Sequence, residues 1–256
     1  MQVNTNYPQQ RKQLSFMQLP FRRLNGIKLF EEIHCQSPAK LLEHGNRRDY
    51  FVRIEDNYTP DEFYIKIDDI NFTPIGESKL SFKNNKTLYN DNIDIIDSNL
   101  KHCGAGTIMR LGEIITMLEN DIDKIELHSL GQAVYFHSKF KFEPVINDIN
   151  QLTNYIRTDI LSRENDKRFE QIAKCAKEWG KNSIVPDTER LKHGNKILYN
   201  YLQCVNKFKL NHDEEFQIYP GFDMMLGKEK VIDNMEYFNK LFEKFGIDYE
   251  IKASAC

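Results

Sequence analysis

A short glycine-rich stretch is the part of the sequence best suited to chemistry. Gly104 and Gly106 stand directly before a strong helical pattern, with Lys101 and His102 just ahead of them. Glycine permits backbone angles that a Cβ disfavours, and it leaves neighbouring amides uncovered. The first turn of a helix has N–H groups without intrahelical partners and carries a partial positive charge. The stretch therefore predicts a phosphate site, although glycines before a helix also serve as ordinary turn residues.

Two nucleotide-binding fingerprints are excluded at this place. A GxGxxG motif would need glycine at position 109, where Met109 stands, and the preceding strand patterns lack crossover helices between them. A P-loop is excluded because no Gly-Lys-Ser/Thr follows the glycines. The ligand of this turn has to be inferred from other residues.

Two segments resemble motifs of the GNAT superfamily of N-acetyltransferases. Residues 101–106, Lys-His-Cys-Gly-Ala-Gly, resemble its (Gln/Arg)-x-x-Gly-x-(Gly/Ala) element, whose backbone amides bind the pyrophosphate of acetyl-CoA. Residues 133–142, Ala-Val-Tyr-Phe-His-Ser-Lys-Phe-Lys-Phe, resemble its Ala-x-x-Phe-Tyr-x-Lys-x-Gly-Phe element. The resemblance covers about residues 26–146 and implies an acetyltransferase with acetyl-CoA as co-substrate. The co-substrate contacts that it implies are Ile96, Lys101, His102, Cys103, Gly104, Ala105, Gly106 and Thr107.

The sequence departs from these motifs at three positions. Lys101 replaces the usual Gln or Arg, and Lys141 stands where the motif has glycine. His137 aligns with the tyrosine that is often the general acid of the family. An imidazole with an unperturbed pKa of about 6.5 exchanges protons near neutral pH, so we predict that His137 is the acid. The alternative is a surface histidine on a short helix.

Acetyl transfer to an amine also needs a base and an oxyanion donor. The amine has to be neutral, the tetrahedral oxyanion stabilised, and the departing thiolate protonated. The resemblance implies an oxyanion donor in the amides of residues 95–97 and a carboxylate base on the same strand. Asp91 and Asp94 are the candidates, and Asp94 is preferred because it interrupts an apolar strand. The alternative is that Asp94 simply faces solvent.

The remaining cysteines and histidines give little indication of chemistry. The five cysteines are widely spaced without a CxxC, which is typical of reduced thiols. With no secretory pattern at the N-terminus, we expect a cytoplasmic protein. No His, Cys and carboxylate spacing indicates a metal site, so none is predicted. His128 is expected to cap a strand or face solvent, and Cys103 is not expected to be a nucleophile.

The periodicity of apolar residues predicts the elements that would position this site. Residues 26–45 have helical spacing, and four alternating patterns follow, around residues 50–55, 63–68, 79–82 and 87–97. A strong helix is predicted over residues 107–120, a strand over 124–128, a short helix over 131–139 and a last edge strand over 248–251. The predicted fold is α/β (α+β), a GNAT-like mixed, mostly antiparallel, splayed sheet flanked by helices, with a helical insertion before the last core strand. The predicted parts are a mobile arm (residues 1–15), the core (16–147), the insertion (148–212) and a final strand and helix (213–256).

Composition limits the classes of partner. The chain has 256 residues, a net charge of −3 and 40% hydrophobic residues, which is a globular profile. This charge argues against bulk nucleic-acid binding, and no apolar run approaches the length of about 18 residues that spans a bilayer. We therefore expect no nucleic-acid or membrane partner. The acceptor stays open between an amine-bearing small molecule and a protein, and an inactive acyl-CoA-binding or protein-interaction domain is the alternative function.

Overall fold

The computed structural model describes residues 21–24, 27–38, 47–56, 59, 61–96, 103–131, 133–181, 185–210, 216, 218 and 220–252. The arm predicted over residues 1–15, together with Lys101 and His102, lies outside these ranges. The structural statements below concern the described residues.

The fold is built on one mixed sheet of eight strands in the order β3-β4-β5-β6-β7-β8-β10-β9. All neighbours pair antiparallel except β7 and β8, which run parallel. The strands are β3 (Glu32–Gln36), β4 (Asp49–Asp56), β5 (Glu62–Asp69), β6 (Pro74–Asn84), β7 (Thr87–Ile95), β8 (Lys124–Ser129), β9 (Glu143–Pro144) and β10 (Phe222–Gly227). A separate two-stranded sheet pairs β1 (Phe21–Leu24) with β2 (Ile27–Phe30).

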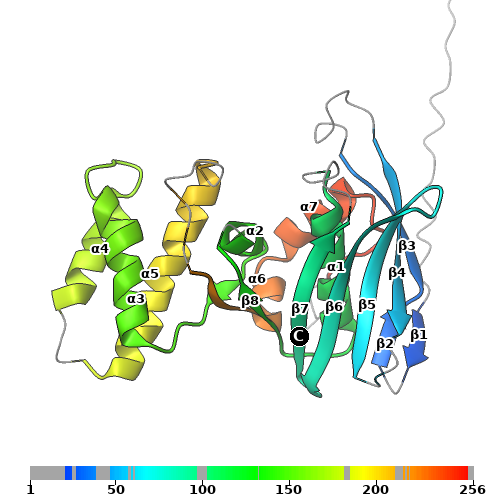
Figure 1. Ribbon diagram of the computed structural model, residues 1–256, viewed down its shortest axis with the longest axis horizontal. Helices are drawn as coiled ribbons and strands as arrows, with labels where there is room; N and C mark the ends of the chain where they lie inside the picture. Colours follow the sequence, from blue (N-terminus) through cyan, green and yellow to red (C-terminus); the bar gives the residue numbers. More distant parts are fainter. Residues whose placement is uncertain are drawn as a thin grey trace, which may run out of the picture.

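The helices fall into a sheet-covering group and a lateral group (Figure 1). The first group is α1 (Ala105–Glu119), α2 (Ala133–Lys139), α6 (Lys228–Asp233) and α7 (Met235–Lys244). The second group is α3 (Ile149–Tyr155), the π-helix η3 (Ile156–Ile160), the 3₁₀ turn η4 (Leu161–Arg163), α4 (Glu170–Lys181) and α5 (Asp187–Lys207). Figure 1 shows α3, α4 and α5 at the end of the molecule opposite β1–β3. None of the described helices has the length and apolar content that a bilayer crossing requires.

The lateral helices contact the rest of the molecule at α2 and at β9 with the residues that follow it. The Gln203 amide of α5 donates to the Ser138 carbonyl at 2.7 Å, and the Asn206 amide donates to the Ser138 hydroxyl at 2.6 Å. Asn195 of the same helix bonds both the N–H and the carbonyl of Ile146. A helical block therefore precedes the last core strand, β10, as predicted. The division into domains stays a prediction.

The predicted mixed, mostly antiparallel sheet is confirmed, but the helix expected over residues 26–45 is wrong where the structure describes it. Residues 27–36 form β2 and β3, which are separated only by Glu31. The buried residues of these short strands are Leu29, Phe30, Ile33 and Cys35. Two strands that change phase at one residue place apolar residues at spacings that imitate a helix. Residues 247–252 contain no strand either, so the edge strand expected over 248–251 is also wrong.

Helix α1 is the centre of the core. It is buried almost all round, because it packs on β4–β7 and is covered by further elements on its other sides. Gly112 allows the closest approach, since a Cβ there would lie 3.2 Å from Phe30 and 3.4 Å from Ile65. We call the sheet face covered by α1 the inner face, and the opposite face the outer face.

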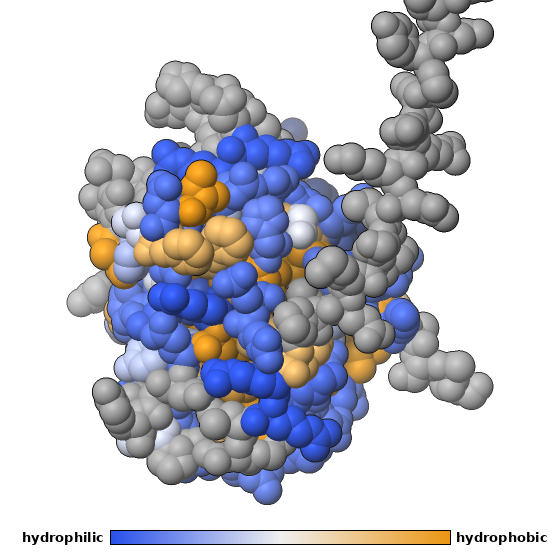
Figure 2. Space-filling model, turned by 90° about the vertical axis from the view of Figure 1, so that its right-hand side faces the viewer, coloured by the Kyte–Doolittle hydropathy of each residue, from blue (hydrophilic) through white to orange (hydrophobic). Residues whose placement is uncertain are grey.

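The β3-side surface of the molecule is mostly hydrophilic (Figure 2). Hydrophobic areas on this face are small and separated by polar side chains. Large exposed hydrophobic residues elsewhere in the described ranges are single, as at Leu130 and Phe208. Scattered apolar residues of this kind are ordinary for a folded surface.

The sheet opens between its two parallel strands. Pairing of β7 with β8 runs from Thr87 opposite Lys124 to Asn90 opposite Leu127 and then stops, although both strands continue. Next to this point β7 has a bulge, because Leu80 of β6 pairs with Asn90 while Lys79 pairs with Asn92. The extra residue is Asp91. The predicted splay is therefore present beyond Asn90.

Candidate functional site

Helix α1 begins at the open end of the sheet. It connects two parallel strands, so its N-terminus lies at the end where β7 has finished and β7 and β8 have separated. Ligands of open α/β sheets bind in this position, outside the carboxyl ends of the strands. The positive end of the helix dipole is directed to the same place.

The first turn of α1 is formed by the predicted glycine stretch. Gly104 is the N-cap residue with φ 93°, a backbone conformation that favours glycine. No side chain caps the helix, and no acidic residue stands in its first turn. The first intrahelical bond runs from the Ile108 N–H to the Gly104 carbonyl at 3.0 Å. Helix geometry therefore gives the N–H groups of residues 105–107 no intrahelical acceptor.

Gly106 meets helix α2. A Cβ at Gly106 would lie 3.4 Å from the Phe136 ring, which is ordinary contact, and its backbone lies outside the left-handed region. Neither packing nor backbone conformation thus demands glycine at 106. Residues 103–107 form this turn and the start of α1, whereas Lys101 and His102 lie outside the described ranges, and contact of these residues with a co-substrate stays a prediction.

The backbone N–H groups at the end of β7 point alternately toward β6 and away from it. The Ile96 N–H donates to the Ile75 carbonyl of β6 at 2.9 Å, so this predicted co-substrate contact already has a bonded amide. Ile95 lies opposite Gly76 in the register. Since N–H groups alternate sides along an antiparallel strand, the Ile95 N–H is directed to the side from which β8 has departed.

Asp94 lies on the outer face of β7. Its side chain is exposed, accepts a hydrogen bond from the Asn92 amide and lies opposite Glu77 of β6. No ion pair joins Asp94 or Glu77 to a cation in the part of the chain that the structure describes. Asp91, the other candidate base, is the bulge residue and faces Lys79 with 3.9 Å between the charged atoms. Asp94 is therefore an exposed carboxylate that faces another acidic residue, whereas Asp91 faces a lysine.

His137 is buried, with only 7% of its surface exposed. Its Nδ1 lies 3.0 Å from an Arg110 guanidinium nitrogen, and its ring contacts those of Phe136 and Phe142. Burial first, and then the positive charge of Arg110, hold the pKa of His137 well below its usual value. The alternative of a surface histidine is wrong, and this environment disfavours the charged form that an acid role near neutral pH would use. Contact of His137 with a co-substrate stays a prediction.

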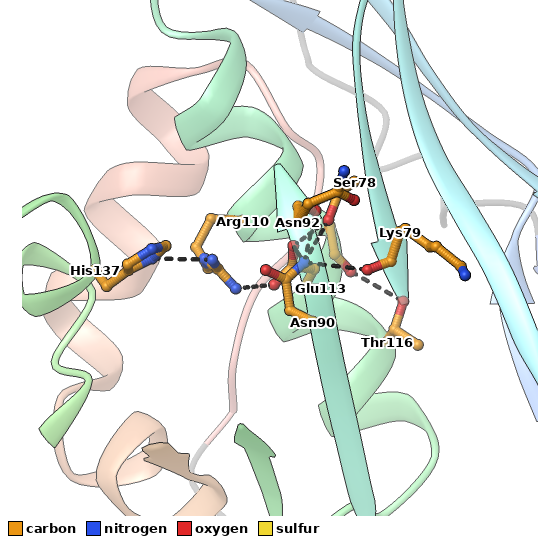
Figure 3. A network of polar contacts seen from close by, with 9 residues as sticks. Ser78, Lys79, Asn90, Asn92, Arg110, Glu113, Thr116 and His137 are labelled. Carbon is orange, nitrogen blue, oxygen red and sulfur yellow. Dashed lines mark hydrogen bonds and ion pairs between the residues drawn. The ribbon is translucent and has the colours of Figure 1, made fainter. Parts of the chain in front are cut away.

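A buried polar network that the sequence did not indicate lies beneath this site (Figure 3). Arg110 and Glu113 of α1 are both fully buried and form an ion pair. The second Glu113 oxygen accepts from the Ser78 hydroxyl at 2.7 Å and from the Asn90 amide at 3.1 Å. Burial raises the pKa of Glu113, while Arg110 and Ser78 oppose that rise by stabilising the carboxylate. The network extends from β6 and β7 through α1 to His137.

The remaining segment around His137 fits the second motif in part. Lys141 stands where the motif has glycine and adopts φ 68°, the left-handed conformation that favours glycine. The Tyr135 hydroxyl donates to the Phe216 carbonyl and is buried. Tyr135 is therefore engaged away from the site.

Other titratable groups do not assemble a second centre in the described ranges. His128 and Asp223 form an exposed pair on β8 and β10 with 2.7 Å between Nδ1 and Oδ1. Cys35, Cys103, Cys175 and Cys204 are free thiols. No group of His, Cys, Asp or Glu side chains in the described parts of the chain is arranged to hold a metal ion.

No family model matches the chain, and no curated protein matches it. Among solved structures, it is similar to an acetyltransferase of the GNAT family from Staphylococcus aureus Mu50, with 20% identity over 34% of this chain and 56% of that chain. It is also similar to the spermidine/spermine N-acetyltransferase SpeG from Vibrio cholerae (18% identity, 35% and 60%) and to nourseothricin acetyltransferase (11%, 44% and 70%). The TM-score is 0.31 in each case. The chain spans little more than half the length of the first two, and likeness at this level carries no argument about function.

Proposed function

We propose that the protein is an acyltransferase that moves an acetyl group from acetyl-CoA to an amine by direct attack in a ternary complex. The observation that carries this proposal is the position of the uncapped N-terminus of α1, at the end of the sheet where β7 and β8 separate. A phosphate on the helix and an extended chain in the gap would occupy one continuous path.

The pyrophosphate would bind the amides of residues 105–107, which the cap geometry leaves without intrahelical acceptors. Cys103 and Gly104 would line the turn, and Lys101 and His102 are kept as co-substrate contacts on the motif resemblance alone. The pantetheine would lie along β7 as an added strand, because β8 no longer pairs there. We assign the thioester carbonyl to the Ile95 amide, since the Ile96 amide is bonded to Ile75.

The reaction would proceed without a covalent enzyme intermediate. The amine loses its proton, through water, to Asp94 and attacks the carbonyl carbon. The C–N bond forms, the oxyanion is held by the backbone amide, and the C–S bond then breaks with the electron pair on sulfur. The thiolate takes up a proton and leaves as CoA. Asp94 and His137 lie on opposite sides of the sheet, so the amine would enter from the outer face while the sulfur faces α2.

A binding measurement tests the phosphate turn. Thr107→Glu adds a carboxylate to the first turn of α1, where the helix dipole favours a negative charge, but the carboxylate repels a pyrophosphate. At a hundredfold excess over Kd, acetyl-CoA should stabilise the wild type by about 2.7 kcal/mol. The thermal shift should vanish in Thr107→Glu and persist in the uncharged control Thr107→Gln. NAD serves as the comparison ligand. A wild type whose unfolding temperature is raised by neither acetyl-CoA nor CoA would contradict the proposal.

A turnover measurement tests the base. With a panel of amine, peptide and protein acceptors, Asp94→Asn should lower kcat by about 10²-fold or more, as expected for loss of a general base. The matched control is Asp91→Asn, which changes the neighbouring bulge carboxylate. Equal losses in the two variants would contradict the assignment of Asp94.

A second candidate function is an acyl-CoA-binding or protein-interaction domain without catalysis. It is favoured by the state of the two groups nearest the motif tyrosine, because His137 is buried and Tyr135 is bonded to Phe216. Coenzyme binding without release of CoA across the whole acceptor panel would support this candidate. In either case we expect the protein to act in the cytoplasm on a small molecule or a protein.

A further inference from the structure

A buried row of polar side chains crosses the molecule from the sheet to α2, and the proposed reaction as described above does not use it. The row is Ser78 and Asn90, then Glu113, then Arg110, then His137 (Figure 3). Arg110 and Glu113 are fully buried, and Ser78, Asn90 and His137 are buried as well. Buried ion pairs seldom add net stability over apolar residues of similar size. Stability alone therefore does not account for this row.

The contact with Arg110 fixes the proton of His137. A guanidinium has five N–H donors and no acceptor, and it stays charged in proteins. The nitrogen that faces it at 3.0 Å, Nδ1, must therefore accept the hydrogen bond and carry no proton. A neutral imidazole with a bare Nδ1 has its proton on Nε2. Among the described residues, Nε2 has no hydrogen-bond partner.

The charge that faces His137 is itself held in place. Arg110 is paired with Glu113, and its guanidinium lies 4.8 Å from the centre of the Phe142 ring. Arg110 is the charged group acting on His137 in the described structure. An imidazolium would place a second positive charge against the guanidinium in a buried site, so the neutral form is favoured.

The row is anchored where the sheet opens. Asn90 is the last residue of β7 that pairs with β8, and its amide also reaches the carbonyls of Lys79 and Asn92, the β6–β7 pair just beyond the bulge. Gly106 and Arg110 are four residues apart on one face of α1, facing Phe136 and His137 of α2 in turn. The same helix face thus leads from the proposed phosphate turn to the imidazole.

We propose that Arg110, backed by Glu113, is a positioning residue that holds His137 as a neutral imidazole with its proton on Nε2, ready to donate a hydrogen bond to the thioester end of an acyl-CoA. This inference rests on the proposed function for its ligand but not for its tautomer. His137 then acts as a fixed donor to the developing charge on sulfur, and the thiolate takes its proton from water.

The tautomer is tested in the free protein, without any ligand. Long-range ¹⁵N–¹H spectra distinguish the two neutral tautomers from the imidazolium. The His137 signals are identified among the seven histidines by their loss in His137→Gln. We expect a proton on Nε2 and none on Nδ1 from pH 5 to pH 8. A proton on Nδ1, or on both nitrogens, would overturn the proposal.

The role of Arg110 is tested with a double variant that keeps the interior neutral. Arg110→Met with Glu113→Gln removes both charges and leaves a carbonyl oxygen to accept from Ser78 and Asn90. We expect His137 in this variant to populate both tautomers or to become doubly protonated on acidification. A pure Nε2–H tautomer that survives the double change would show that Arg110 is not what fixes it.

Kinetics separate positioning from stability. In the double variant kcat should fall by about 10²-fold, as for loss of one preorganised donor, while KM for acetyl-CoA is unchanged. His128→Gln, an exposed histidine on β8, is the matched control and should leave kcat unchanged. An unchanged kcat in the double variant contradicts the proposal. A wild type that neither binds nor turns over acetyl-CoA overturns the proposed function, and the spectra then still decide the Arg110–His137 assignment.

Discussion

Strands β6 and β7 carry polar side chains on both faces, but the two faces hold charge in different ways. On the inner face, Ser78 and Asn90 lead to the fully buried pair Arg110–Glu113. On the outer face, Lys79 lies between Glu62 at 3.3 Å and Asp91 at 3.9 Å, with all three side chains partly exposed. Alternate residues of one strand therefore belong to two electrostatic environments.

The difference between the two faces shows which ion pairs hold side chains in fixed positions and which can rearrange. A buried pair has lost its water, so removing one partner leaves a charge without compensation. A surface pair exchanges its partner for water at little cost. The inner row therefore fixes the geometry of its side chains, whereas on the outer face Glu77 and Asp94 oppose each other without a cation in the described ranges and stay in contact with water.

The largest effect is expected from breaking the inner pair on one side only. Arg110→Met should lower the free energy of unfolding by about 3–5 kcal/mol, because it leaves the Glu113 carboxylate buried and unpaired. Equilibrium urea unfolding measures the change. The double variant Arg110→Met, Glu113→Gln should recover much of the loss. A single variant as stable as the double would contradict the distinction between the two faces.

A smaller effect is expected from crowding the open end of the sheet. A Cβ at Gly76 would lie 2.5 Å from the carbonyl oxygen of Asp94 and 3.1 Å from the Ile95 side chain, so backbone has to move. Gly76→Ala should cost about 1–3 kcal/mol in the same unfolding measurement. Gly227→Ala is the control, because nothing lies within 4 Å of a Cβ there. Equal stabilities of the two variants would show that the backbone at the open end of the sheet can move aside without cost.

A smaller change again is expected when the outer ion pairs are removed, because an exposed pair exchanges its partner for water at little cost. Lys79→Met deletes the cation that faces Glu62 and Asp91 and leaves both carboxylates partly in water. The residual difference from the wild type should shrink further as salt is added, since exposed charges are screened. A loss comparable to that of Arg110→Met would mean that the outer face is as tightly organised as the inner one.

The smallest effect concerns an exposed carboxylate at the end of the sheet where β7 and β8 are paired. Hydrogen bonds from Lys228 and Lys86 lower the pKa of Asp121 from 3.8 to about 2. Because the folded pKa is depressed, its contribution to stability is complete above pH 3.8 and is lost as the pH falls toward 2. Carboxyl NMR titration of Lys228→Gln should show the pKa of Asp121 moving upward. An unchanged titration would mean that Lys228 does not hold this carboxylate.

The sequence predicted the elements whose periodicity is set locally. Phe63, Ile65 and Ile67 alternate with polar residues and do form a half-buried strand, β5. The stripe of Ile108, Leu111 and later residues does mark α1. The failure at residues 27–36 has a local cause too, since two strands of 4 and 5 residues are too short to establish a period of two.

The candidate site was predictable only where its structure depends on residues that are neighbours in the sequence. The turn at Gly104 could be anticipated, because a left-handed N-cap depends on the residue that occupies it. Arg110, Glu113 and Thr116 recur every three residues along α1, which on a helix indicates a solvent-facing stripe. That stripe is buried because Glu113 faces β6 and β7 while Arg110 faces α2. The burial of His137 depends on the same covering, which no local pattern encodes.

The short parallel pairing of β7 with β8 has a mechanical consequence. Four residue pairs, from Thr87 with Lys124 to Asn90 with Leu127, are the ladder that joins β3–β7 to β8, β10 and β9. The sheet thus consists of two parts, β3–β7 and β8–β10–β9, that are joined by this short ladder beside α1. A ligand that lay extended between the separated strand ends would form hydrogen bonds to both parts and so connect them a second time. Occupancy of the gap should then slow amide exchange in β9 and β10 as well as in β7, so that a small molecule stiffens strands that it does not touch.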